Sequence, residues 1–244
     1  MKEQIIVISG GSRGLGGALA ADLLARGHRV ATFSRKSSPL IDDLKNQDPS
    51  GRAFYWEAID GTDFDALRSF VLAAEKRFGR IDALINNAAM LLEGVLALTP
   101  RAEIHRALAL NLESVIYLTQ ACVKAMLRNR SGKIISISSL NAIRGHRGIS
   151  IYSAAKAALD GFTRSLAREL GPTGILVNSV APGYFESEMS GEMGEKQRQQ
   201  IIRRTPAGRL GTTDDLVGVI RFLLSEDARF ITGQTVVVDG GLTC

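Results

Sequence analysis

The chain has 244 residues, 45% of them hydrophobic and 23% charged, and this composition excludes an intrinsically disordered or fibrous protein. Its 30 basic and 25 acidic side chains give a net charge of +5, which favours anionic partners without identifying one. The apolar runs are too short for a signal peptide or a membrane span, and no nucleic-acid-binding motif accompanies the basic residues, so we expect a cytoplasmic protein that binds neither membrane nor nucleic acid. Cys122 and Cys244 lack the spacing of a metal site, and no metal is expected.

Short β-rich runs alternate with longer helical patterns along the whole chain. Near-continuous apolar runs, typical of strands covered on both faces of a parallel sheet, occur at Ile5–Ser9, Arg29–Phe33, Ala53–Ala58, Ala83–Asn86, Lys133–Ser138, Leu176–Ala181 and Thr235–Val238. Helical periodicity separates them at Leu15–Arg26, Phe64–Phe78, Arg101–Arg128, Ile151–Leu170 and Thr213–Ser225. This alternation predicts an α/β fold, a single Rossmann domain over residues 1–244, with a doubly wound, seven-stranded parallel sheet and helices on both faces.

One stretch interrupts the alternation. Residues 184–209 are polar, follow the Ala181-Pro182-Gly183 turn, and carry one helical piece near Glu195–Arg203. An insertion after the sixth strand lies at the carboxyl edge of the sheet, where doubly wound folds bind their ligands. We therefore expect a substrate lid at about 184–209, with a plain surface excursion as the alternative.

A glycine-rich turn follows the first expected strand and precedes the first expected helix. It reads Ser9-Gly10-Gly11-Ser12-Arg13-Gly14-Leu15-Gly16. Glycines in such a turn let the backbone approach a pyrophosphate, which is stabilised by the free N–H groups and the positive dipole end of the helix. We therefore predict that a dinucleotide cofactor contacts Gly10, Ser12, Arg13, Gly14, Leu15 and Gly16.

The end of the second expected strand indicates which dinucleotide is bound. It reads Ser34-Arg35-Lys36, where NAD-binding proteins usually place an acidic residue. A guanidinium suits the 2′-phosphate of NADP, so Ser34 and Arg35, with Arg13 in the first turn, predict NADP(H) as the cofactor. The alternative is that both arginines are solvated loop residues. Asp60, after the third expected strand, is either an acceptor for the adenine amino group or a helix cap.

The chemistry is expected between Ser139 and Lys156. Tyr152 and Lys156 are four residues apart at the start of a helical pattern, so they lie on one helix face, one turn apart. An ammonium about 4 Å from a phenol contributes about 4 kcal/mol at an effective dielectric of about 20, enough to lower the tyrosine pKa from about 10 to about 7. Ser139 follows a strand-like run, where its hydroxyl could hold a carbonyl oxygen beside the phenol. On their own, Tyr152 and Lys156 could equally be an ordinary surface pair.

Taken together, these residues resemble the short-chain dehydrogenase/reductase family over essentially the whole chain. The family's T-G-x-x-x-G-x-G turn is matched from Ser9 to Gly16, with serine in place of threonine. Its N-N-A-G motif is matched by Asn86-Asn87-Ala88-Ala89, with alanine in place of the last glycine, and its P-G turn beside the nicotinamide by Pro182-Gly183. The spacing of its Asn-Ser-Tyr-Lys tetrad is matched by Asn111, Ser139, Tyr152 and Lys156.

The resemblance implies a role for each matched residue. Tyr152 would donate a proton to a substrate carbonyl oxygen as hydride arrives from the nicotinamide, and Ser139 would hold that oxygen. Lys156 would bind the ribose hydroxyls and lower the Tyr152 pKa, while Asn111 would position a water that relays protons to Lys156. The remaining implied cofactor contacts are Asn87, Ala88, Pro182, Gly183 and Ser187, the last through the carboxamide.

Within the family, the chain most resembles the 3-oxoacyl-[acyl-carrier-protein] reductases, through its glycine turn, Arg130 and the Asp239-Gly240-Gly241 ending. This resemblance implies an NADPH-dependent ketoreductase of 3-oxoacyl thioesters in fatty-acid or polyketide-type synthesis. It implies that Arg128 and Arg130 lie near the site and dock an acidic acyl carrier protein. The family's long helices pack in pairs, which implies a homotetramer. The residues expected to line the substrate pocket are Asn141, Ile149 and Tyr184.

Two other functions stay open. Thr173 occupies a position where those reductases commonly carry an arginine that contacts the carrier. Together with Asn141 and Ile149, it favours an NADP-dependent dehydrogenase of a free sugar, polyol or sterol. The other alternative is a non-catalytic NADP-binding sensor, which would be marked by loss of Tyr152 or Lys156, and both are present.

Overall fold

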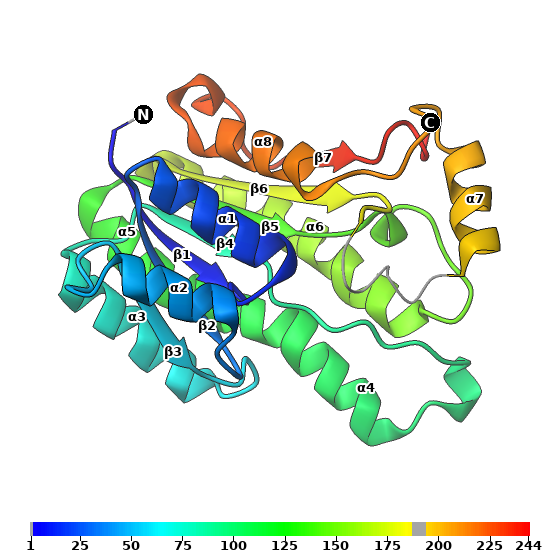
Figure 1. The fold of residues 1–244 in the computed structure, drawn as a ribbon, viewed down its shortest axis with the longest axis horizontal. Helices are drawn as coiled ribbons and strands as arrows, with labels where there is room; N and C mark the ends of the chain where they lie inside the picture. Colours follow the sequence, from blue (N-terminus) through cyan, green and yellow to red (C-terminus); the bar gives the residue numbers. More distant parts are fainter. Residues whose placement is uncertain (1, 187–193) are drawn as a thin grey trace.

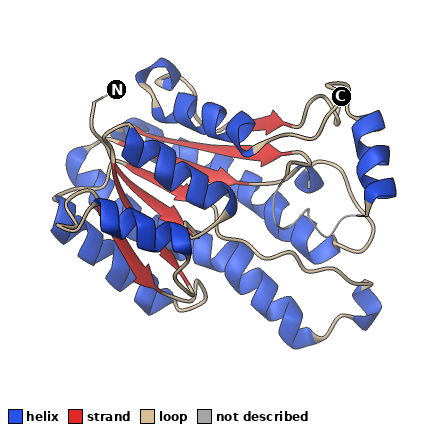
Figure 2. Ribbon diagram, in the orientation of Figure 1, coloured by secondary structure: helices blue, strands red, loops and turns tan. Residues whose placement is uncertain are grey.

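The structure is a computed structural model of the chain and describes residues 2–186 and 194–244. Within these residues, seven parallel strands form one sheet in the order β3-β2-β1-β4-β5-β6-β7. The strands are β1 (Ile5–Ser9), β2 (Arg29–Ser34), β3 (Phe54–Ala58), β4 (Ala83–Asn86), β5 (Gly132–Ile137), β6 (Ile175–Pro182) and β7 (Thr235–Val238). The predicted doubly wound parallel sheet is confirmed, and Figure 2 shows its strands between helices on both faces.

Helices cover the sheet in two layers (Figure 1). One face carries α1 (Gly14–Ala25), α2 (Pro39–Gln47) and α8 (Thr213–Leu224). The opposite face carries α3 (Phe64–Phe78), α5 (Ser114–Asn129) and α6 (Ser150–Leu170). Two further helices, α4 (Arg101–Leu108) and α7 (Glu195–Arg204), lie towards the carboxyl ends of the strands. No described helix is both long and apolar enough to cross a membrane.

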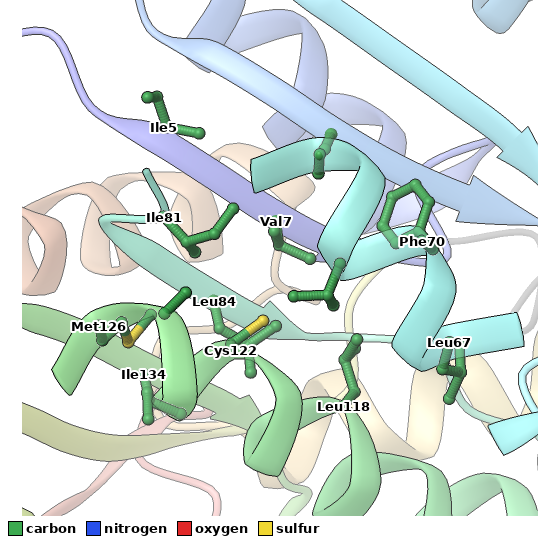
Figure 3. Packing of buried hydrophobic residues seen from close by; sticks show 14 of the residues in the cluster. Ile5, Val7, Leu67, Phe70, Ile81, Leu84, Leu118, Cys122, Met126 and Ile134 are labelled. Atoms are coloured by element: carbon green, nitrogen blue, oxygen red, sulfur yellow. The ribbon is translucent and has the colours of Figure 1, made fainter. Parts of the chain in front are cut away.

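The apolar strands supply both cores because successive side chains of a strand point to opposite faces. In β1, Ile5 and Val7 pack with Phe70 of α3, whereas Ile6 and Ile8 pack on the other face with the α1 side chains. Figure 3 shows the first of these cores from close by. Each such buried isoleucine or phenylalanine contributes about 1.5–3 kcal/mol to folding. The near-continuous apolar runs in the sequence therefore follow from burial on both sides of the sheet.

Two helices differ from the sequence prediction. α2 is absent from that prediction; it begins after Ser38, whose Oγ accepts a hydrogen bond from the Ile41 amide (3.3 Å), and Pro39 is its first residue. The helix predicted over Arg101–Arg128 is divided into α4, a π-helical turn at Ala109–Glu113, and α5. The division matters because π-helical turns are rare and are frequently found at functional sites.

The topology places several loops at one edge of the sheet. The order of the strands reverses between β1 and β4, because the chain proceeds from β1 to β2 and β3 on one side and returns to β4 on the other. At such a switch point, the loops that follow the two strands diverge and leave a crevice outside their carboxyl ends. The glycine turn follows β1, and the Asn87 loop follows β4. The glycine turn and the Asn87 loop, both predicted to bind the cofactor, are thus brought to the same crevice.

Candidate active site

Close contacts in the glycine turn require residues without side chains. Gly10 has a φ of +74°, which strains any other residue. A Cβ at Gly16 would lie 2.3 Å from the Gly10 carbonyl oxygen and 2.5 Å from Asn87 Nδ2. The first turn of α1 therefore packs against the turn that precedes it with no room for a methyl group.

Hydrogen bonds join this turn to the loop after β4. The Ser9 hydroxyl accepts hydrogen bonds from the amides of Asn87 and Ala88, both at 2.9 Å. In return, Asn87 Nδ2 donates to the carbonyl oxygens of Ser9 (3.0 Å) and Gly10 (3.2 Å). Serine thus does what the family's usual threonine would do here, since only its hydroxyl is used.

Space for an anion exists at the N-terminus of α1. Gly14 is the first residue of the helix, has a φ of +55°, and a Cβ built on it would have no neighbour within 4 Å. Arg13 and Gly14 are exposed, whereas Leu15 is buried in the core and anchors the helix. Ser12 is fixed from outside the turn, because its carbonyl oxygen accepts from the Ser38 hydroxyl (2.7 Å). This open helix N-terminus fits the pyrophosphate of a dinucleotide.

A basic group borders the crevice after β2. Arg35 is exposed, and its charge, with that of Arg106 on α4, helps the backbone N–H of Thr62 to lower the pKa of Asp60. The Asp60 carboxylate also accepts from the Thr62 hydroxyl (2.8 Å), so it shapes its own turn. Ser34 is likewise engaged, since its hydroxyl donates to the Lys36 carbonyl oxygen (2.8 Å). Arg106 is a cationic neighbour that the sequence did not reveal.

Three tetrad residues meet at the carboxyl end of β5. Lys156 Nζ donates to the Ile137 carbonyl oxygen (2.6 Å) and lies 5.7 Å from the centre of the Tyr152 ring. The Ser139 side chain acts on the Tyr152 phenol and opposes the rise of its pKa by burial, and the Ser139 hydroxyl accepts from the Asn141 amide (3.1 Å). Ser139 and Lys156 are buried, at 7% and 2% exposure. Because Lys156 is buried, Tyr152 and Lys156 are not the ordinary surface pair that their spacing alone allowed.

The predicted direction of the Tyr152 pKa is wrong for this structure. Burial raises the pKa of the phenol, and the opposing influence is that of the Ser139 side chain. Lys156 does not lower it, because its ammonium is directed to the Ile137 carbonyl oxygen and is itself buried. Burial lowers the pKa of Lys156 to about 8, against the charge of Asp160, which raises it.

Asn111 lies in the π-helical turn and is completely buried. Its Oδ1 accepts from the Met90 amide (2.9 Å), and its Nδ2 donates to the Met90 carbonyl oxygen (2.8 Å). Both polar groups of the side chain are therefore used to hold the loop after β4. Asn111 connects the break between α4 and α5 with the crevice.

The remaining predicted contacts surround the end of β6. A Cβ at Gly183 would lie 2.6 Å from Asp239 Cβ, which explains the glycine after Pro182. Tyr184 is half-buried; burial raises its pKa, and the charge of Arg144 opposes that shift. Ile149 is buried near the start of α6, and the Asn141 Oδ1 atom is buried without a partner among the described residues. Ser187 lies outside the described residues.

The prediction that Arg128 and Arg130 lie near the site is wrong for the site of the same chain. Arg128 lies in the last turn of α5 and Arg130 is its C-cap, just before β5, so both lie at the amino edge of the sheet. α5 has 16 residues and is roughly 24 Å long, which separates them from the tetrad edge. Arg128 forms an ion pair with Glu75 of α3, and Arg130 ends α5 with a φ of 49°.

Comparison with known proteins identifies the family. A family model described as "Enoyl-(Acyl carrier protein) reductase" matches residues 10–243. A double mutant of a Serratia marcescens short-chain dehydrogenase/reductase superposes with a TM-score of 0.91 at 32% identity, covering 99% of this chain and 98% of that one. The chain belongs to the short-chain dehydrogenase/reductase family. It is an oxidoreductase, and the cofactor of this family is a nicotinamide dinucleotide.

Two curated relatives in this family cover nearly the whole chain. The 3-oxoacyl-[acyl-carrier-protein] reductase FabG of Escherichia coli is 36% identical over 241 residues, which are 98% of this chain and 97% of the relative. Nodulation protein G of Azospirillum brasilense is 36% identical over 243 residues, which are 99% of both chains. The predicted resemblance to 3-oxoacyl-[acyl-carrier-protein] reductases is confirmed at the level of sequence similarity.

Proposed function

We propose that this protein is an NADPH-dependent ketoreductase that reduces the 3-keto group of an acyl thioester carried on an acyl carrier protein. The observation that carries the proposal is the meeting of Ser139, Tyr152 and Lys156 at the edge of the sheet that also bears the glycine turn. The name of the Escherichia coli relative supplies the class of substrate.

The cofactor residues fit a dinucleotide with a 2′-phosphate. The open space at Gly14 would take the pyrophosphate, and Arg35 at the end of β2 would pair with the 2′-phosphate. Asn87 and Ala88, with Pro182 and Gly183 across the crevice, would contact the nicotinamide half. When bound, this cofactor supplies the hydride.

Tyr152 would act as the proton donor. Because burial raises its pKa, the phenol stays protonated at neutral pH and can give its proton to the substrate carbonyl oxygen. The Ser139 hydroxyl, which acts on the same phenol, would donate to the same oxygen. Two preorganised donors at one oxygen stabilise the negative charge that develops there.

Lys156 and Asn111 would have supporting roles in this chemistry. With a pKa of about 8, Lys156 is mostly protonated at neutral pH, and its ammonium would donate to the ribose hydroxyls. Asn111, whose side chain binds both backbone groups of Met90, would position a water that relays protons to Lys156.

The substrate would enter beside the end of β6. Asn141, Ile149 and Tyr184 would line its pocket, and the buried Asn141 Oδ1 offers an acceptor for a substrate N–H or O–H group. Arg144, which donates to the Leu242 carbonyl oxygen (3.2 Å) and influences Tyr184, adds a cation beside the pocket. Residues 187–193 of the segment at about 184–209 lie outside the described residues. We propose that this segment, which includes α7, covers the bound substrate.

The assay that tests this function follows NADPH consumption with one 3-oxoacyl chain offered on acyl carrier protein and, separately, on a small thioester. A strong preference for the carrier supports the full proposal. Equal rates would retain the ketoreductase and remove the carrier. No consumption with either would contradict the proposed reaction and direct the search to free ketones and alcohols.

A homotetramer is part of the proposal. Ile116, Tyr117 and Leu127 on α5 are 38%, 46% and 41% exposed, which leaves apolar side chains on the outer surface of this helix. Packing of a second copy against α5 would cover them. Sedimentation velocity should then give four chains per particle, and a monomer at micromolar concentration would contradict this assembly.

A further inference from the structure

A buried carboxylate on α6 has no part in the chemistry above. Asp160 follows Lys156 by one turn of α6, so the two side chains lie on the same helix face. The two residues are 8% and 2% exposed, respectively. A charge in such a place is unfavourable unless an opposite charge or hydrogen bonds stabilise it.

Hydroxyl groups of two strands hold Asp160 in place. The Ser179 hydroxyl of β6 donates to Asp160 Oδ1 (2.8 Å). Because that hydroxyl has a single proton, the 2.8 Å contact with Thr235 of β7 is a hydrogen bond donated by Thr235. The row Asp160, Ser179 and Thr235 thus runs from α6 across two strands and fixes the carboxylate.

Among the described residues, the groups found in contact with the Lys156 ammonium are neutral. From β5 it meets the Ile137 carbonyl oxygen (2.6 Å), and from its own helix the Tyr152 ring, whose centre is 5.7 Å away. From β6, the Ser179 hydroxyl contacts Asp160 and not the ammonium itself. Among the described groups that influence the Lys156 charge, Asp160 is the one anion.

We propose that Asp160 is a positioning residue for Lys156. Its negative charge keeps the buried ammonium protonated and ready to donate to the ribose hydroxyls of the cofactor. This inference rests on the proposed function, because it assumes that Lys156 binds the ribose. A neutral lysine would lose the charge-assisted hydrogen bonds, which are about twice as strong as neutral ones.

The test measures the NADPH dissociation constant by cofactor fluorescence from pH 6 to pH 9. In the unchanged protein, binding should weaken as pH rises through about 8, the pKa of Lys156. Asp160→Asn keeps the shape and the acceptor for Ser179 but removes the charge. Its transition should move to lower pH by about one unit, so that NADPH binds several-fold more weakly at pH 7.5 and equally well at pH 6.

Matched variants separate charge from packing. Ser179→Ala removes the hydrogen bond and retains the carboxylate, so its transition should stay within about 0.3 pH units of the original. In a Lys156→Met background, Asp160→Asn should have no further effect on NADPH binding. If Asp160→Asn does not fold, Asp160→Leu removes the same charge and leaves Ser179 its hydrogen bond from Thr235.

An unchanged pH transition in Asp160→Asn, or equal weakening of binding at pH 6 and pH 7.5, would overturn the inference while the proposed function stands. Failure of the unchanged protein to bind NADPH at any pH would overturn the proposed cofactor itself. The two failures are therefore distinguishable in one set of measurements.

Discussion

Replacement of Gly16 by alanine should disrupt the cofactor turn. The new Cβ would lie 2.3 Å from the Gly10 carbonyl oxygen and 2.5 Å from Asn87 Nδ2. Both neighbours are held in place, since Asn87 Nδ2 donates to the carbonyl oxygens of Ser9 and Gly10. The methyl group must displace either the backbone of the turn or the Asn87 amide.

The size of the effect follows from these contacts. Overpacking of this kind costs about 1–3 kcal/mol. Loss of the two Asn87 hydrogen bonds costs about 0.5–1.5 kcal/mol each. The free energy of unfolding should thus fall by about 2–6 kcal/mol, which for a chain of this size lowers the melting temperature by roughly 4–24 °C. NADPH should also bind more weakly, because the displaced N–H groups border the pyrophosphate position.

Gly218→Ala is the matched control for thermal unfolding monitored by circular dichroism. Gly218 lies inside α8, and a Cβ there would have no neighbour within 4 Å. Alanine should therefore stabilise the protein by about 0.5–1 kcal/mol. If Gly16→Ala melted within a degree of the unchanged protein and bound NADPH equally well, the close contacts described for the turn would not limit substitution, and the reasoning would be refuted.

Three further outcomes are expected. Arg35→Ala should weaken NADPH binding roughly 10–100-fold and NADH binding little, since only NADPH presents the 2′-phosphate; in a binding titration with Arg229→Ala, an exposed arginine at the amino edge of the sheet, as control, equal loss for both cofactors would show that Arg35 does not contact the phosphate. Burial opposes ionisation of Asp48, but the amides of Ala53 and Phe54, with further hydrogen bonds, lower its pKa to about 2. A depressed carboxyl pKa adds stability above about pH 4 that is lost as pH falls towards 2, so in acid titrations followed by urea unfolding Asp48→Asn should be less stable at pH 7 and approach the unchanged protein near pH 2; a constant difference would be inconsistent with this. Burial also raises the pKa of the Cys122 thiol, so a thiol reagent should modify one cysteine, the exposed Cys244, in the native protein and two after denaturation; two rapid reactions in the native state would contradict the buried position.

The strands could be predicted from the sequence because their burial on both faces makes them apolar throughout. β4 and β7 occur where predicted, and β1 begins and ends at its predicted residues. α2 gives a weak signal instead, since only Ile41 and Leu44 are buried among its nine residues. The π-helical turn at Asn111 could not be read from the sequence either, because one extra residue in a turn barely disturbs the helical pattern around it.

The site was predictable in its residue types but not in its electrostatics. The spacing of Tyr152 and Lys156 indicates that they share a helix face, and the structure places them together. Spacing does not show how deeply the phenol is buried or that the ammonium turns to the Ile137 carbonyl oxygen, and these facts reverse the direction of the Tyr152 pKa. The sequence also misplaced Arg128, because the position of a residue along α5 does not indicate which edge of the sheet that residue reaches.

Hydride transfer in a Tyr152→Phe variant tests the central claim most directly. NADPH consumption with a 3-oxoacyl thioester would be compared in the unchanged protein and in this variant, with NADPH binding measured in both. We predict that the unchanged protein reduces the thioester and that the variant retains NADPH binding but loses at least about 100-fold in kcat, because general acid catalysis contributes 10²–10⁴-fold. Turnover by Tyr152→Phe at the original rate would contradict the assignment of Tyr152 as the proton donor.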